Sequence, residues 1–241
     1  MSGKIKFYLS MSEDARFGKA KILEKYRDAT FLENKDTDTQ GYILKSGSNL
    51  LISFRGTQQT KDWATDINGF HQVIPYGNYD SDIRIHRGFL NAYKSIRGDI
   101  HKYISSKRNE IKAIHVCGHS LGGALAVLCA VDVEYNYPSY HIECYPSGNP
   151  KVGNKAFCDS YDKRVPITVR TYMRTDIVPT LPPEWIEKFF GQKSCHVGQK
   201  NPIGPRNIFI GLINWFKRKF KTEKFLADLS NHSITLYKKY A

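Results

Sequence analysis

Short apolar runs alternate with longer stretches of helical character along most of this chain. The runs of strand length are rich in β-branched or aromatic residues and lie at 49–54, 111–117, 140–145 and 165–173. The helical stretches lie at 12–27, 88–108, 121–133 and 155–163. Such alternation predicts an α/β fold with a mostly parallel central sheet and helices on both faces. The length of 241 residues fits one domain, so we expect a single domain over 1–241.

One strand-to-helix junction carries a Gly-x-Ser-x-Gly pattern, in the segment Gly118-His119-Ser120-Leu121-Gly122. A serine at such a turn is held in strained backbone, with its hydroxyl presented at the carboxyl edge of a sheet. The glycines leave room for the bend, and the helix directs its positive amino end toward the place where an oxyanion would form. The pattern alone arises often by chance, but here strand, turn and helix follow in order. We therefore predict Ser120 as a nucleophile.

A serine hydroxyl is a weak nucleophile unless a histidine takes its proton and a carboxylate orients that histidine. In hydrolases with this turn the partners follow in the order Ser, Asp or Glu, His. Asp176 comes just after the run at 165–173, at the carboxyl end of a predicted strand. Its alternative role is that of a turn residue before a proline-rich loop. Asp159 and Asp162 fall in a predicted helix, so Asp176 is favoured.

Two histidines lie beyond a suitable acid, His196 and His232. His232 stands at the start of a predicted terminal helix, and such a junction brings an imidazole over the sheet edge, so we predict it as the base. His196 lies in a short strand-like run and is interpreted as structural. His119 is on the wrong side of the turn to serve Ser120, and His86 is interpreted as a histidine satisfied by hydrogen bonds.

Ester hydrolysis also needs donors aimed at the developing oxyanion. The backbone N–H of Leu121, directly after the nucleophile, is the first candidate. Thr57 follows the run at 49–54 and offers both its N–H and its hydroxyl, so it is the second.

Composition indicates a globular protein, with 41% hydrophobic and 13% aromatic residues. No window approaches the ~18 apolar residues of a membrane span, and the first residues lack the apolar stretch of a signal peptide. We therefore expect an intracellular protein, with a peripheral membrane location as an option. The net charge of +13 favours a polyanionic partner. Because no nucleic-acid-binding motif is present, we expect no nucleic acid; an anionic lipid surface or a merely solubilising lysine-rich surface explains the charge.

Five cysteines stand at 117, 129, 144, 158 and 195, without close-spaced pairs. Their odd number leaves at least one unpaired, and Cys117 and Cys129 flank the serine turn in the predicted core. We interpret them as buried reduced thiols of an intracellular protein and expect no zinc site. The predicted chemistry requires neither a metal nor an organic cofactor.

Several segments in the same order resemble the class 3 lipase family, which includes the fungal triacylglycerol lipases. The likeness runs from about Tyr42 to Tyr237. It is carried by SFRGT (53–57), DWATD (62–66), HRGF (86–89), GHSLGGALA (118–126), SGNPKVGN (147–154), DIVP (176–179), LPP (181–183), HVG (196–198) and HSI (232–234). The resemblance implies an α/β-hydrolase fold, Ser120, Asp176 and His232 as a catalytic triad, and Thr57 and Leu121 as the oxyanion pair.

In that family a lid over the active site follows the Arg-Gly-Thr segment. Here Trp63, Ile67 and Phe70 fall at helical spacing, which predicts a short amphipathic lid helix over 60–70. The alternative is that these side chains pack into the core. The chain differs from the secreted fungal members in lacking a signal peptide and an evident disulfide framework, which argues against a secreted digestive role.

A basic amphipathic segment lies at 208–221. On a helix, one face of this segment would carry Phe209, Leu212, Ile213, Phe216 and Phe220. The flanking basic residues are Lys217, Arg218, Lys219 and Lys221. This pattern suits docking on an anionic bilayer, and an ordinary surface helix packing on the sheet is the alternative.

Together these features predict a serine hydrolase that cleaves carboxylic esters of lipids through an acyl-serine intermediate. The alternatives are a lipase-like binding or signalling scaffold without turnover, a phospholipase acting on anionic membranes, and a phospholipid-binding protein. Triacylglycerol, monoacylglycerol, phospholipid and short soluble esters are all compatible with the sequence.

Overall fold

The computed structural model describes residues 2–56, 70–72, 81–182, 187, 193–205 and 229–241. Its main sheet has seven strands in the order β1-β2-β3-β6-β7-β9-β11. Their bounds are Thr30–Asn34 (β1), Thr39–Ser46 (β2), Asn49–Phe54 (β3), Ala113–His119 (β6), His141–Ser147 (β7), Val169–Met173 (β9) and Gln199–Ile203 (β11). β1, β2 and β3 pair antiparallel, and every pairing from β3 to β11 is parallel. The predicted, mostly parallel central sheet is confirmed.

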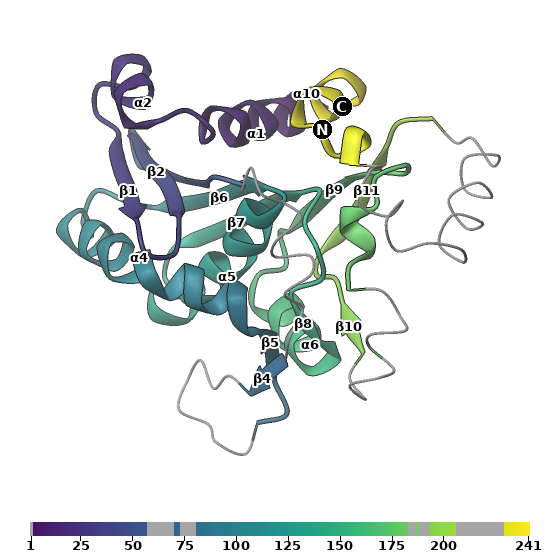
Figure 1. The fold of residues 1–241 in the computed structure, drawn as a ribbon. Coiled ribbons are helices and arrows are strands. Elements are labelled where there is room, and N and C mark those ends of the chain that lie inside the picture. Colours follow the sequence, from purple (N-terminus) through teal and green to yellow (C-terminus); the bar gives the residue numbers. More distant parts are fainter. Residues whose placement is uncertain (1, 57–69, 73–80, 183–186, 188–192, 206–228) are drawn as a thin grey trace.

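Helices cover both faces of this sheet (Figure 1). The helices α4 (Arg87–Ser106) and α5 (Leu121–Asn136) cover one face. The helices α1 (Ser2–Asp14) and α10 (Ile234–Tyr240) lie over the other, and α2 (Lys19–Lys25) continues from α1 toward β1. Because strand side chains alternate between faces, Leu50 and Ile52 of β3 join the core under α4 and α5, whereas Leu51 joins the core under α1.

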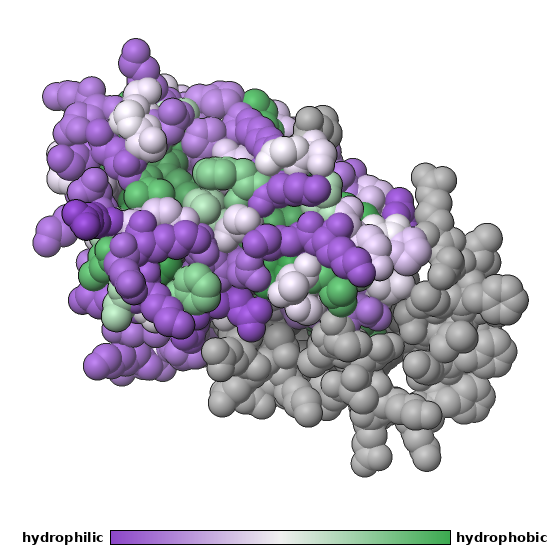
Figure 2. All heavy atoms as spheres, turned by 90° about the horizontal axis from the view of Figure 1, so that it is seen from above, coloured by the Kyte–Doolittle hydropathy of each residue, from purple (hydrophilic) through white to green (hydrophobic). Residues whose placement is uncertain are grey.

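The outer surface over α1, α2 and α10 is mostly hydrophilic, with smaller apolar areas between the polar side chains (Figure 2). The buried side of α1 is mostly apolar and includes Ile5, Tyr8 and Leu9. Tyr8 stacks on Tyr145 of β7 with ring centroids 3.9 Å apart. In the described part of the chain, no helix is both long and apolar enough to span a bilayer.

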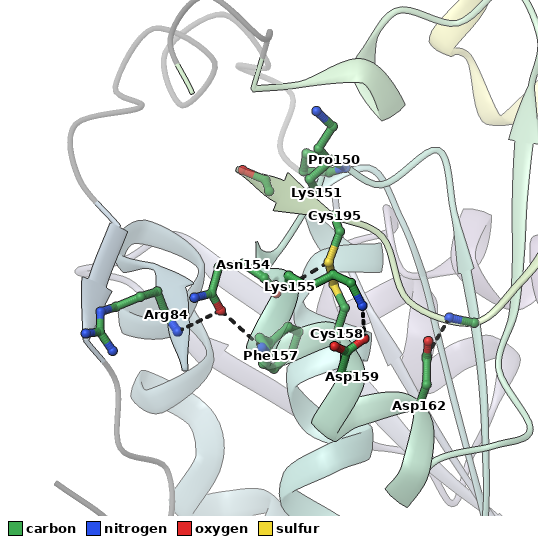
Figure 3. Close-up of a disulfide and its surroundings, with 12 residues drawn as sticks. Arg84, Pro150, Lys151, Asn154, Lys155, Phe157, Cys158, Asp159, Asp162 and Cys195 are labelled. Carbon is green, nitrogen blue, oxygen red and sulfur yellow. Dashed lines mark hydrogen bonds and ion pairs between the residues drawn. A yellow bond between two sulfur atoms is a disulfide. The ribbon is translucent and has the colours of Figure 1, made fainter. Parts of the chain in front are cut away.

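A second, four-stranded sheet has the order β10-β8-β5-β4. Its strands are β10 (Ser194–Cys195), β8 (Gly153–Asn154), β5 (Arg84–His86) and β4 (Phe70–Gln72). The helix α6 (Lys155–Arg164) follows β8, and the side chain of Asn154 accepts a hydrogen bond from the N–H of Phe157 to cap it. The same side-chain oxygen accepts from the N–H of Arg84, so Asn154 joins the sheet to the helix (Figure 3).

A disulfide between Cys158 of α6 and Cys195 of β10 closes this region (Figure 3). The expectation that all cysteines are reduced thiols is therefore wrong for these two. Cys117, Cys129 and Cys144 are free and buried, as expected for core thiols.

The predicted helix over 12–27 is also wrong, because two helices occupy this part of the chain. α1 begins at Ser2, since its apolar residues pack on the sheet, and Ser12 lies inside it. The hydroxyl of Ser12 donates to the carbonyl of Tyr8 four residues earlier instead of capping a helix.

The strand predicted over 165–173 begins later, at Val169. Val165 caps the end of α6, and Pro166 follows it without an N–H to donate. Within the predicted lid helix over 60–70, Phe70 instead begins β4, where it pairs with His86. Trp63 and Ile67 lie outside the described residues.

Candidate active site

Ser120 stands in the sharp turn between β6 and α5. Its φ of 61° and ψ of −127° lie in a backbone region that residues other than glycine rarely adopt. Its N–H donates to the carbonyl of Ser147 at 2.9 Å, which ties the turn to β7. The backbone thus holds this serine at the carboxyl end of a central strand.

The two glycines of the pattern are required by close backbone contacts. A Cβ at Gly118 would lie 2.1 Å from the carbonyl oxygen of Gly122. A Cβ at Gly122 would lie 2.3 Å from the carbonyl oxygen of Phe54. Neither position has room for a methyl group, so this turn can be built only with glycine on both sides of the serine.

Asp176 follows β9 and accepts three hydrogen bonds. Its Oδ2 accepts from His232 Nδ1 at 2.7 Å and from the hydroxyl of Tyr237 at 2.5 Å. Its Oδ1 accepts from the N–H of Val178 at 2.9 Å. Burial, and then the charge of Asp176, raises the pKa of Tyr237 well above its usual value, so this phenol stays a neutral donor. Asp176 therefore orients the His232 ring through Nδ1 and leaves Nε2 to act as an acceptor.

His232 Nε2 and Ser120 Oγ are both buried, and neither has a hydrogen-bond partner among the described residues. His119, the neighbour of Ser120 in the chain, stacks on the imidazole of His232 with ring centroids 4.6 Å apart. The structure thus brings Ser120, Asp176 and His232 to one edge of the sheet. A buried hydroxyl and a buried imidazole nitrogen without partners are the two atoms that a proton transfer from serine to histidine would use.

Leu121 is the first residue of α5, so its N–H has no acceptor within the helix. The positive end of α5 therefore lies beside the serine. Gly56 lies against the same turn, because a Cβ there would be 3.2 Å from the Cβ of Ser120 and 2.7 Å from the carbonyl oxygen of His119. Thr57, the predicted second oxyanion donor, lies outside the described residues.

The family model described as "Lipase (class 3)" matches residues 51–185. This chain belongs to the class 3 lipase family. The resemblance that the motifs predicted is therefore confirmed.

Relatives of this chain include fungal and plant enzymes. It is 31% identical over 153 residues to a lipase of Rhizomucor miehei, covering 61% of this chain and 41% of the relative. It is 28% identical over 174 residues to phospholipase A1-IIgamma of Arabidopsis thaliana, covering 61% and 42%. The chain thus spans about two fifths of the length of the curated relatives it matches.

Solved structures of fungal lipases share the fold of this chain. The Rhizomucor miehei lipase in its propeptide complex matches with a TM-score of 0.69 at 24% identity, over 86% of this chain and 69% of that one. The lipase of Rhizopus microsporus var. chinensis matches with a TM-score of 0.67 at 25% identity, over 83% and 74%. The α/β-hydrolase fold is confirmed.

The histidines and acids that the sequence analysis set aside have structural contacts. The Nε2 of His196 contacts the carbonyl oxygen of Pro179 at 2.6 Å, and burial lowers the pKa of His196 to about 3. Asp162 accepts from the N–H of Gly198 at 2.8 Å, and Asp159 pairs with Lys155 on α6. The buried ring of His86 lies against Phe89, with centroids 4.2 Å apart.

Two residues at the site were not found from the sequence. Tyr237 contacts Asp176 from α10, and His119 contacts His232 across the sheet edge. Tyr237 shares with Ile234 the buried face of a short helix, which reads as ordinary core packing. No sequence motif indicates that its hydroxyl reaches a carboxylate 61 residues away.

Proposed function

We propose that this member of the class 3 lipase family is a serine hydrolase that cleaves carboxylic esters of lipids. The observation that carries the proposal is the His232–Asp176 hydrogen bond, which leaves His232 Nε2 unpartnered at the same sheet edge as the unpartnered hydroxyl of Ser120. A scaffold without turnover has no need of a strained serine together with an oriented histidine. The complete set of Ser120, Asp176 and His232 therefore favours an enzyme.

In the proposed reaction, Ser120 Oγ attacks the ester carbonyl while His232 Nε2 takes its proton. The N–H of Leu121 and Thr57 stabilise the negative charge that develops on the carbonyl oxygen. The carbonyl–oxygen bond to the alcohol then breaks, and His232 returns the proton to the leaving alcohol. Water, deprotonated by His232, hydrolyses the acyl-serine and restores the free hydroxyl.

Two observations support a lipid ester as the substrate. Relatives of the chain are named as lipases, as a phospholipase A1 and as a secreted mono- and diacylglycerol lipase of Malassezia globosa. The net charge of +13 suits an anionic lipid surface, so a phospholipase acting on anionic membranes is the second candidate. Docking through Lys217, Arg218, Lys219 and Lys221 is part of this second candidate, and these residues lie outside the described part of the chain.

Access to the serine belongs to the same proposal. Ser120 is only 3% exposed, so an ester must displace neighbouring atoms to reach it. Opening of a lid that carries Trp63 and Ile67 would expose the serine to the ester. This lid remains a prediction.

Hydrolysis of p-nitrophenyl esters from short to long acyl chains tests the proposal, with anionic vesicles and with detergent present in parallel. We expect release that depends on Ser120, with Ser120→Ala lowering kcat by at least ~10⁴-fold. A fluorophosphonate probe should label the wild type and leave Ser120→Ala unlabelled. Absence of both turnover and labelling under every condition would favour the scaffold alternative.

A further inference from the structure

His119 connects the nucleophile to the base through contacts that the proposed reaction does not use. Its Nε2 contacts the carbonyl oxygen of His232 at 2.7 Å, between residues 113 positions apart. Its ring stacks on the His232 imidazole at 4.6 Å and meets the ring of Tyr237 edge-on at 4.9 Å. Because His119 directly precedes Ser120, this hydrogen bond joins the nucleophile turn to the backbone of the base.

These contacts determine the tautomer and charge of His119. A carbonyl oxygen only accepts, so Nε2 must carry the hydrogen. Burial, and then the nearby His232, lowers the pKa of His119 well below its usual value, and Arg16 acts in the same direction. The ring is therefore neutral, and its Nδ1 accepts from the hydroxyl of Ser147 at 3.2 Å. That hydroxyl also lies 3.2 Å from the carbonyl oxygen of Gly118, so it is shared between two acceptors.

Gly148 lies against all three rings and has a φ of 55°. A Cβ at Gly148 would lie 2.8 Å from Cε1 of His119, 3.1 Å from Cε1 of His232 and 3.0 Å from the hydroxyl of Tyr237. The three rings thus meet at a backbone position that only glycine can occupy.

We propose that His119 is a positioning residue, which holds the backbone of His232 so that Nε2 of the base stays within reach of Ser120 Oγ. This inference rests on the proposed esterase function. Among the described residues, Asp176 holds the imidazole of His232 and His119 holds its carbonyl. The neutral state of His119 also contributes. The face of its uncharged ring stacks on His232 and can stabilise the imidazolium that forms there during the reaction. A second cation there would oppose the proton transfer.

A matched pair of amide variants tests this role. In His119→Gln, the side-chain amide reaches the position of Nε2 and still donates to the His232 carbonyl. In His119→Asn, the amide reaches only the position of Nδ1, so the contact with Ser147 is kept and the donor to His232 is lost. We expect His119→Asn to lower kcat about 10- to 100-fold with KM within about twofold, since misplacement by ~1 Å costs up to this much. We expect His119→Gln to stay within about fivefold of the wild type.

Fluorophosphonate labelling amplitude and the thermal unfolding midpoint show that both variants are folded. Equal loss of kcat in both variants, or wild-type kcat in His119→Asn, would overturn the inference. If His119→Asn does not fold, His119→Met replaces it, because the methionine side chain fills the space of the ring and has no donor for the His232 carbonyl. A lower kcat than in His119→Gln at constant KM is then expected, and equal kcat in these two variants would contradict the role of His119. Failure of the proposed function is distinct, since the wild type itself would then show no serine-dependent turnover.

Discussion

The backbone at Ser120 has a conformation that glycine adopts freely and serine does not, with φ at 61°. Holding a side chain there costs about 1–3 kcal/mol, which the surrounding packing must offset. The serine is thus kept at a position where a glycine would fit the fold with less strain.

We expect the free energy of unfolding of Ser120→Gly to exceed that of Ser120→Ala by about 1 kcal/mol. The urea midpoint of Ser120→Gly should therefore be higher. The reason is that alanine keeps the strained Cβ while glycine removes it, although glycine loses more chain entropy on folding. Urea denaturation of the two inactive variants, followed by circular dichroism, measures the difference. Equal midpoints would show that the turn stores no strain at this residue.

Ser120, Asp176 and His232 could be predicted from the sequence, because a nucleophile turn, a strand end and a helix start are local patterns. The structure brings these three residues to one edge of the sheet, and their catalytic roles stay a prediction. The contacts of His119 and Tyr237 were beyond such reasoning, since each joins residues far apart in the chain through a single polar atom. Their partners depend on how α10 and the turn before it pack on the sheet.

At the scale of elements, long apolar patterns were predicted well and short or polar ones were not. The strand at Asn49–Phe54 was predicted with its observed bounds, and α5 begins at the predicted Leu121. Errors arose where tertiary packing overrides local signals. α1 extends through Ser12, and the largely polar strand β11, which pairs with β9, was not predicted.

The disulfide gives an element-scale prediction. Cys158 and Cys195 are 37 residues apart, and the bond joins α6 to β10. Closing a loop of this size stabilises a protein by about 2–4 kcal/mol, so we expect Cys158→Ser with Cys195→Ser to lower the free energy of unfolding by this amount.

Urea denaturation with and without dithiothreitol measures the effect of this bond. Reduced wild type should match the double variant, and the double variant should not respond to the reductant. If reductant leaves the wild-type midpoint unchanged, the bond does not stabilise the folded chain.

For the whole molecule, the net charge of +13 is the property most open to test. Replacing Lys217, Arg218 and Lys219 with glutamate should weaken binding to anionic vesicles by at least two orders of magnitude. The estimate follows from about 1 kcal/mol for each basic residue near an anionic surface. Vesicle co-sedimentation at low and high salt measures the change, and salt should reduce the difference.

The control for this experiment replaces Lys94, Lys102 and Lys163 with glutamate. These exposed lysines lie on α4 and α6, and the change in net charge is the same. Equal weakening in both triple variants would show that total charge governs binding and would contradict docking through 217–219.

The intracellular location remains a prediction. One of its arguments was that the five cysteines are reduced, and the disulfide between Cys158 and Cys195 contradicts that argument. Disulfides of this kind persist mainly in oxidising compartments. The pairing was not visible in the sequence because it depends on β10 lying beside the start of α6.

The packing of α10 on α1 also has a consequence for when activity can begin. Lys238 of α10 pairs with Glu13 of α1 at 2.5 Å, and Ser2 donates to the carbonyl of Ala241 at 2.8 Å. During synthesis the nucleophile turn and Asp176 leave the ribosome before His232 and Tyr237 exist. The helix α10 must dock on α1, which precedes it in the chain, before the base is held in place. A chain synthesised only as far as Asp176 therefore has Ser120 but no histidine to activate it, and the proposed hydrolysis can start only after α10 has docked.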